Sequence, residues 1–305
     1  MPAKNALDVK ISILIPCYNW DISNLINDLH ILCIQESRLN NFEIICIEDG
    51  SSNCFSNNSI KELPNVQYDV LRKNIGRSAI RNLLANKARF EWLLFIDCDS
   101  KIATNDFILN YIKSIIESTE KESANSYIYY GETRYEKKET KNKLHQKYGI
   151  KIESKRKKDN FSSHHFLIQK AGFTQNQFNE NIKSYGYEDV LFQIKHTYRF
   201  QYIKNPLYHI GLKTNEHFIK DCESGLKNLL QYSENKKVIQ KIKILRWCST
   251  FEFAHLKIPI MFLFNIFKSS ILRNLLSKNP SLFLFQFYKI GFFLQLKHTS
   301  AKKRK

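Results

Sequence analysis

Short apolar runs alternate with helix-like segments through the first third of the chain. The runs are rich in β-branched residues and stop at polar ones, which is typical of buried strands; they are ISILI (11–15), FEIICI (42–47), VQYDVL (66–71) and WLLFID (92–97). Residues 21–39 and 77–88, between these runs, carry apolar side chains at helical spacing. The alternation predicts an α/β protein with a mainly parallel sheet flanked by helices.

Polar residues follow three of the predicted strands, at 16–19, 48–51 and 97–100. Ligands of open parallel sheets bind beyond the carboxyl ends of the strands, so these segments are expected to gather at one edge of the sheet. We expect the functional site there.

The segment FIDCDS places Asp97 and Asp99 at the end of the run 92–97. Two carboxylates separated by one residue can hold a hard divalent cation through oxygen. An Asp-x-Asp tripeptide also occurs in ordinary turns, so its neighbours decide its meaning.

The chain becomes less regular after residue 100. We predict a helix over 104–119, strands over 126–131 and 164–168, and a basic loop over 137–158. A further apolar stripe at helical spacing begins near Val190, with Glu188 and Asp189 in its first turn, where acids suit the helix dipole.

The charge of this 305-residue chain is unevenly spread. Of the formal net charge of +18, residues 236–305 carry +14, from fifteen Lys or Arg and the single acid Glu252. The run 137–158 holds ten Lys or Arg against two Glu. Because the basic character is local, a protein coated with nucleic acid is not indicated.

The seven cysteines form no C-x-x-C pair, and several lie in or beside predicted strands. This is typical of reduced, buried thiols. The start MPAKNALDVK has no apolar signal region, so we expect a cytoplasmic protein.

Six segments, in this order, resemble the family 2 glycosyltransferases of the GT-A fold, which are inverting enzymes that use nucleotide-diphosphate sugars. The segments are ILIPCYN, IEDGSS, NIGRSAIRN, FIDCDS, GYEDV and NPLYHIG, and the resemblance covers about residues 10–235. The part from Phe178 to His196 is similar to the galactosyltransferase-type end of chondroitin-synthase-like members.

The resemblance implies a set of donor-binding residues: Pro16, Tyr18, Asn19, Asp49, Arg77, Arg81 and Asp97. Tyr18 would stack on a uracil ring, or else be a core aromatic at a strand end. Asp49 would contact the nucleoside, or else only form the Asp-Gly turn. Arg77 and Arg81, four apart near a helix start, would cradle the diphosphate, although one of them would also suit a solvated face.

The resemblance also implies a Mn²⁺ or Mg²⁺ ion on Asp97, Asp99 and His209, where His209 is alternatively a structural histidine. Asp189 would be the general base that deprotonates the acceptor hydroxyl, with Glu188 binding the acceptor or orienting the site; the alternative is Glu188 as the base. His164 and His165 would be structural or face the acceptor.

We therefore expect residues 1–235 to form a catalytic domain that moves one sugar from a nucleotide-diphosphate donor, a UDP-linked hexose or N-acetylhexosamine, to a glycan or lipid-linked glycan. No Q-x-x-R-W signature of processive synthases follows Asp189, which favours single transfer. A nucleotidyl or phosphoryl transferase is the alternative enzyme, but the chain has no lysine-bearing glycine-rich phosphate loop. A non-catalytic peripheral membrane protein is the other alternative.

Residues 236–305 are expected to form a basic, aromatic-rich helical extension. Its apolar runs are shorter than the ~20 residues of a spanning helix. A helix on the anionic inner face of the cytoplasmic membrane fits this composition, while a subdomain that packs on the core or dimerises is the alternative. The basic run 137–158 would be a gate over the acceptor or a solvated loop.

Overall fold

The computed structural model of the chain describes residues 8–53, 57–120, 127–155, 161–182 and 186–303. Eight strands form one sheet: β1 Lys10–Cys17, β2 Asn41–Glu48, β3 Val66–Val70, β4 Trp92–Ile96, β5 Ser100–Ile102, β6 Tyr127–Arg134, β7 His165–Gln169 and β8 Arg199–His209. The strand order is β3-β2-β1-β4-β7-β6-β8-β5.

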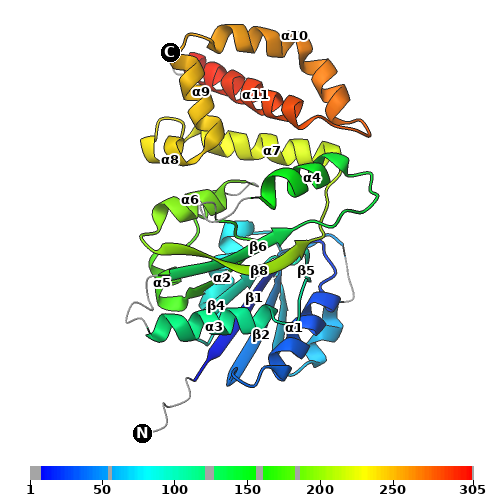
Figure 1. Ribbon diagram of the computed structural model, residues 1–305, viewed down its shortest axis with the longest axis vertical. Helices are drawn as coiled ribbons and strands as arrows, with labels where there is room; N and C mark the ends of the chain where they lie inside the picture. The colour runs from blue at the N-terminus through cyan, green and yellow to red at the C-terminus, as the bar shows by residue number, and fades with distance from the viewer. Residues whose placement is uncertain (1–7, 54–56, 121–126, 156–160, 183–185, 304–305) are drawn as a thin grey trace. The chain divides into compact units, whose positions relative to one another are not determined.

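The sheet is mixed. The pairs β1–β2, β1–β4, β2–β3 and β6–β8 are parallel, whereas β4–β7, β6–β7 and β5–β8 are antiparallel. This arrangement, with its flanking helices and a helical C-terminal part, confirms the predicted mixed α/β fold of the GT-A kind (Figure 1).

Helices cover both faces of the sheet. Four helices lie beside the strands: α1 Ser23–Gln35, α2 Arg77–Lys87, α3 Phe107–Glu120 and α5 Lys170–Gln175. The buried cluster that includes Ile13 and Leu94 takes in residues of α1 and α3. Phe95 points to the opposite face, where its ring centroid lies 5.0 Å from that of Phe173 in α5. Alternation along buried strands therefore builds two apolar layers.

The strands differ from the expectation in two respects. We expected Pro16 to end the first strand, but β1 continues to Cys17, with Pro16 paired to Ile47. Beyond Leu14, β1 still pairs with β2 but no longer with β4. Pro16, which has no backbone N–H, is tolerated there because one side of β1 has no paired strand. The strands β5 and β8 were not predicted, because β5 has three residues and β8 contains Pro206.

The chain divides into two compact units: residues 1–135, 156–183 and 195–211 form the first, and residues 136–155, 184–194 and 212–305 the second. The first unit holds all eight strands of the sheet, together with α1, α2, α3, α5 and the 3₁₀ turn η1 (Asn57–Glu62). These limits differ from the predicted division between residues 235 and 236. That division, as one between catalytic and accessory parts, stays a prediction.

The second unit is helical. It contains α4 Lys143–Tyr148, the π-helical turn η3 Gly149–Glu153, most of α6 Glu188–Lys195, α7 Asn215–Leu230, α8 Lys236–Lys241, α9 Lys243–Phe253, α10 Lys257–Leu275 and α11 Leu282–Lys303. Two apolar clusters hold these helices together, one around Leu226 and Leu294 and the other around Phe218 and Phe285. The predicted helical character of this extension is confirmed for residues 236–303.

The basic run 137–158 is not a loop throughout, as we had expected. Residues 143–153 form α4 and η3, and Leu144 is fully buried in the cluster around Phe218. One apolar side chain among many lysines was too weak a periodic signal to predict this helix. Residues 156–158 lie outside the described residues.

In the described ranges, no single helix is long and apolar enough to cross a membrane. The pair α9 and α10, bent by 116°, passes the same test of length and composition when taken together. The six cysteines within these ranges are free thiols, whereas Cys54 lies outside them.

Candidate functional site

Strand β4 delivers the two acidic residues of FIDCDS to the edge of the sheet. All five residues of β4 are buried, and the next residue, Asp97, still donates its backbone N–H to the carbonyl of His164 at 2.9 Å. The side chains of Asp97 and Asp99 are 21% and 22% exposed. Both carboxylates are therefore partly exposed, although the strand that precedes them is buried.

Asp97 forms an ion pair with Arg81 of α2. Arg81 Nη2 lies 2.5 Å from Asp97 Oδ1, and the arginine is only 2% exposed. Burial raises the pKa of Asp97, while the charges of Arg81 and Arg77 oppose that rise. Arg81 is thus a buried partner of the acid, whereas Arg77, the first residue of α2, is exposed.

Asp99 lies against His209 at the end of β8. Asp99 Oδ2 is 3.2 Å from His209 Nε2, and β5 and β8 bring the residues together by pairing Ser100 with His209. Burial would raise the pKa of Asp99, but His209, His164 and Arg77 hold it well below its usual range. Sequence analysis predicted this juxtaposition only through the family resemblance.

Gly211 also contacts Asp99, and the sequence analysis did not single it out. A Cβ at Gly211 would lie 2.2 Å from Asp99 Oδ2, so a larger residue would displace the carboxylate. The backbone N–H of Ile210 donates to the carbonyl of Asp99 at 2.9 Å. The segment after β8 therefore positions Asp99.

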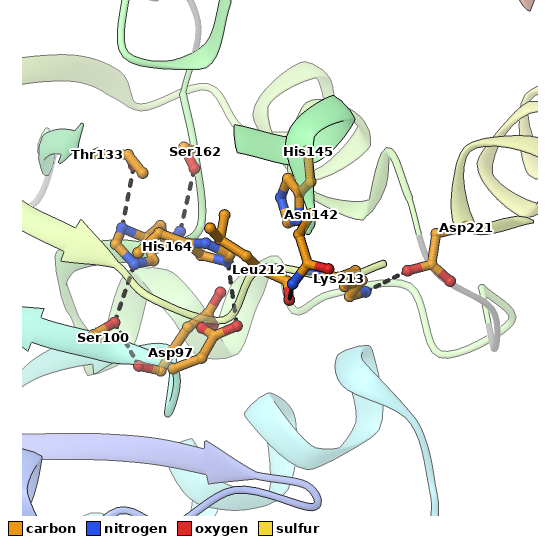
Figure 2. Close-up of polar contacts among 12 residues, drawn as sticks. Asp97, Ser100, Thr133, Asn142, His145, Ser162, His164, Leu212, Lys213 and Asp221 are labelled. Atoms are coloured by element: carbon orange, nitrogen blue, oxygen red, sulfur yellow. Dashed lines mark hydrogen bonds and ion pairs between the residues drawn. The ribbon is translucent and has the colours of Figure 1, made fainter. Parts of the chain in front are cut away.

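A buried chain of polar groups supports the acidic pair (Figure 2). Ser100 Oγ donates to the Asp97 carbonyl at 2.6 Å and lies 3.0 Å from His164 Nε2, and His164 Nδ1 lies 3.1 Å from Thr133 Oγ1. Because the serine proton goes to the carbonyl, His164 must donate from Nε2 and accept from Thr133 at Nδ1. Burial lowers the pKa of His164 well below its usual value, in keeping with this neutral ring.

His165 points to another network. Its Nδ1 lies 2.6 Å from the hydroxyl of Tyr111 and its Nε2 lies 3.4 Å from the carbonyl of Glu132. Both His164 and His165 are buried, which favours the structural alternative for each.

Asp99 and His209 would fit a divalent cation whose remaining ligands are substrate phosphates and water. A carboxylate and an imidazole, from Asp99 and His209, converge at one point. Within the ranges that the structure describes, no group of three or more His, Cys, Asp or Glu is placed as a complete ligand set. Mg²⁺-type sites in phosphate-handling enzymes take one or two carboxylates and complete their shell with water and substrate phosphates, so two protein donors are compatible with such a site.

Asp49 holds the turn that precedes α2. It is 4% exposed, and its two carboxylate oxygens accept the backbone N–H groups of Ile75 at 2.7 Å and Gly76 at 3.1 Å. Burial raises the pKa of Asp49, while these two hydrogen bonds oppose the rise. Asp49 thereby joins the strand end of β2 to the start of α2, and its contact with a nucleoside stays a prediction.

The segment after β1 is held in a fixed conformation. Asn19 has a positive φ of 50°, its N–H donates to Ser51 Oγ at 2.7 Å, and its side-chain oxygen accepts the N–H groups of Ser52 and Asn53 at 2.9 and 3.0 Å. Tyr18, beside it, is 50% exposed, which excludes the core-aromatic alternative. Asn19 therefore links two of the predicted polar segments.

Glu188 and Asp189 begin α6 in the second unit. Glu188 is buried, and its side-chain oxygen accepts the backbone N–H of Gly186 at 3.0 Å. Asp189 is partly exposed and its Oδ1 accepts its neighbour's N–H, from Val190, at 2.7 Å. In the same unit, Asn142 donates to the Leu212 carbonyl at 2.8 Å, and Lys213 pairs with Asp221 (Figure 2).

Comparison with known proteins gave one family match. The family model "Glycosyl transferase family 2" matches residues 12–178, which is more than half of the chain. This match includes the strand ends that carry Tyr18, Asp49 and the acidic pair. No curated protein matches the chain.

Several solved structures are similar to this chain at low identity. S. aureus TarS has 17% identity and a TM-score of 0.48, over 95% of this chain and 55% of that chain. S. aureus TarS 1-349 in complex with UDP-GlcNAc has 15% identity and a TM-score of 0.49, over 97% and 92%. GalNAc-T7 with UDP, GalNAc and Mn²⁺ has 14% identity and a TM-score of 0.49, over 67% and 44%.

Proposed function

The chain belongs to glycosyltransferase family 2, and we propose that it transfers a single sugar, with inversion, from a nucleotide-diphosphate sugar to a hydroxyl group. The donor is a UDP-linked hexose or N-acetylhexosamine, as the sequence resemblance implies. The acceptor is a glycan or a lipid-linked glycan. The galactosyltransferase-type resemblance of residues 178–196 supports a glycan acceptor.

The pairing of Asp99 with His209 is the observation that carries this proposal. It supplies a carboxylate and an imidazole at the end of β4, where ligands of such sheets bind. Of the three predicted ligands Asp97, Asp99 and His209, the last two are the residues that would hold a Mn²⁺ or Mg²⁺ ion, because Asp97 is paired with Arg81. When bound, the ion stabilises the negative charge that develops on the leaving diphosphate.

The remaining donor-site residues orient the nucleotide. The half-exposed ring of Tyr18 is available to stack on the base, and the exposed Arg77 at the start of α2 meets the diphosphate. Asp97 contacts the ribose in the orientation that Arg81 imposes on its carboxylate. Arg81 is therefore assigned a positioning role rather than direct contact with phosphate.

Asp189 is the proposed general base. It removes the proton of the acceptor hydroxyl while the acceptor oxygen bonds to the anomeric carbon and the bond from that carbon to the diphosphate oxygen breaks. Partial exposure supports Asp189 over Glu188, which is buried; each carboxylate accepts one backbone hydrogen bond, from Val190 and Gly186 respectively. Glu188 then stabilises the turn before α6.

A donor screen tests the reaction class. Uridine, guanosine and thymidine diphosphate sugars are incubated with the protein, with Mn²⁺, with Mg²⁺ or with EDTA, and released nucleoside diphosphate is measured. We expect metal-dependent release from a uridine donor, and an Asp99→Asn variant at least 100-fold slower. Asp106→Asn, at an exposed acid before α3, serves as the matched control and should keep full activity. Release of sugar 1-phosphate instead, with the nucleoside monophosphate transferred to an acceptor, would indicate a nucleotidyl transferase.

A second experiment separates the base from donor binding. Asp189→Asn should abolish transfer to an acceptor while UDP binding, measured by calorimetry, stays within about twofold. Glu188→Gln should retain transfer, because its amide oxygen can still accept from Gly186. Loss of UDP binding in Asp189→Asn would show that Asp189 is structural. Equal loss of transfer in both variants would contradict the assignment of Asp189 rather than Glu188 as the base.

A further inference from the structure

Helix α10 has two apolar faces, and only one of them is covered. Phe264, Ile271 and Leu275 are buried in the second unit. Phe264 packs so tightly on α11 that a Cβ at Gly291 would lie 2.3 Å from its ring. The inner face is therefore fully used in holding the helices together.

The outer face of α10 is apolar as well. Its exposed side chains, with exposed fractions, are Ile258 75%, Phe262 64%, Leu263 45%, Ile266 55% and Phe267 51%. At about 100° per residue these five positions fall within one half of the helix circumference. Large exposed side chains gathered on one helix face, unlike apolar residues scattered singly, mark an interaction surface.

Further exposed apolar residues lie just beyond both ends of the helix. Phe253 is 88% exposed and Leu256 is 46% exposed before α10, and Leu276 is 44% exposed after it. The outer face of α10 and these three residues are called the α10 surface below.

The chain around the α10 surface is predominantly basic. Residues 253–305 contain no Asp or Glu, while Lys257, Lys268, Arg273 and Lys278 lie in or next to the helix. Glu252, the last acid along the chain, pairs with Lys257 and Lys297. The surroundings of the α10 surface are therefore strongly basic.

We propose that the α10 surface docks on an anionic phospholipid surface, with the helix lying in the plane of the interface. Phe and Leu side chains would insert at the level of the headgroups, and the flanking lysines and arginines would meet anionic lipid. The inference concerns membrane binding and is independent of the proposed sugar transfer.

Charge argues against a second copy of the chain as the occupant. Residues 236–305 carry a net charge of +14, so two such segments brought face to face would repel each other. An anionic surface removes that repulsion and gains attraction from the same residues.

Vesicle flotation of the full chain tests the proposal. Vesicles of phosphatidylcholine in which about one lipid in three is the anionic phosphatidylglycerol are compared with vesicles of pure phosphatidylcholine. Both are tested at low and at high salt. The triple variant Phe262→Ser, Ile266→Ser, Phe267→Ser removes the centre of the surface. Ile31→Ser with Ile34→Ser, two exposed apolar residues of α1, is the matched control.

We expect the parent and the α1 control to float with the anionic vesicles, and the triple variant to lose at least 10-fold in partitioning. Circular dichroism and thermal melting should be unchanged, since all three residues are more than half exposed. Equal partitioning of parent and triple variant would overturn the proposal. So would a parent that does not float but is a dimer that the triple variant dissociates, as measured by analytical ultracentrifugation.

Discussion

Arg81 Nη2 lies 2.5 Å from Asp97 Oδ1, and it joins the buried face of α2 to the end of β4. Arg81 was expected to bind phosphate, but this contact makes it a residue that orients the Asp97 carboxylate. It also makes the strand end dependent on a charge that is almost fully buried.

Replacing Arg81 should destabilise the protein. Arg81→Ala leaves the Asp97 carboxylate without its buried partner, and we expect the free energy of unfolding to fall by about 3–5 kcal/mol. Urea denaturation measures this change. Arg38→Ala breaks an exposed pair with Glu36 and should lower it by about 1 kcal/mol or less. Similar losses in the two variants would mean that the buried pair contributes no more than a surface pair.

Gly211 should be intolerant of any side chain. In Gly211→Ala the new methyl group would meet Asp99 Oδ2 at 2.2 Å and push the carboxylate away from His209. We expect sugar transfer to fall at least 10-fold with little change in melting temperature. Ile210→Ala, at a residue 37% exposed, should keep its activity. Equal activity of the two variants would show that the position of Asp99 is not critical.

Stability should depend on pH through His165. Burial lowers the pKa of His165 from 6.5 to about 3, so the unfolded chain binds a proton at this residue where the folded chain does not. Protonation therefore favours unfolding as the pH falls from about 6.5 towards 3, and at pH 5 the loss is about 2 kcal/mol.

His165→Gln removes this titration. We expect the difference in the free energy of unfolding between pH 7 and pH 5 to be smaller in the variant by about 2 kcal/mol. His298→Gln, at a partly exposed histidine of α11, is the control that should leave the difference unchanged. An unchanged difference in His165→Gln would contradict the low pKa.

Close approach of α10 and α11 predicts a further sensitive position. Gly291→Val would force a branched side chain against the Phe264 ring, which a Cβ alone would already approach to 2.3 Å. Overpacking of this kind destabilises by about 1–3 kcal/mol or more. Thr299→Ala, exposed on α11, should change the free energy of unfolding by less than about 0.5 kcal/mol. Thermal unfolding compares the two variants, and equal melting temperatures would exclude tight packing at Gly291.

Much of the fold could be predicted because the strands are nearly continuous apolar runs with polar ends. The strands that include Ile13, Ile44 and Leu94 were all predicted, and α2 begins at Arg77 as expected. Short or interrupted elements were missed: β5 has three residues, β8 contains a proline, and α4 lies in a basic run with Leu144 as its buried anchor. Local patterns are too weak there, and pairing with distant residues decides the structure.

By itself, the sequence determined the parallel start of the sheet, the gathering of Tyr18, Asp49 and Asp97 at its edge, and the location of the basic charge, since periodicity, chain order and composition are local properties. Only the tertiary structure decided that Arg81 serves Asp97, that Gly211 contacts Asp99, and that one face of α10 stays exposed. These relationships join residues far apart in the chain. They depend on which side chains are brought into contact, and which are left exposed, when the chain packs.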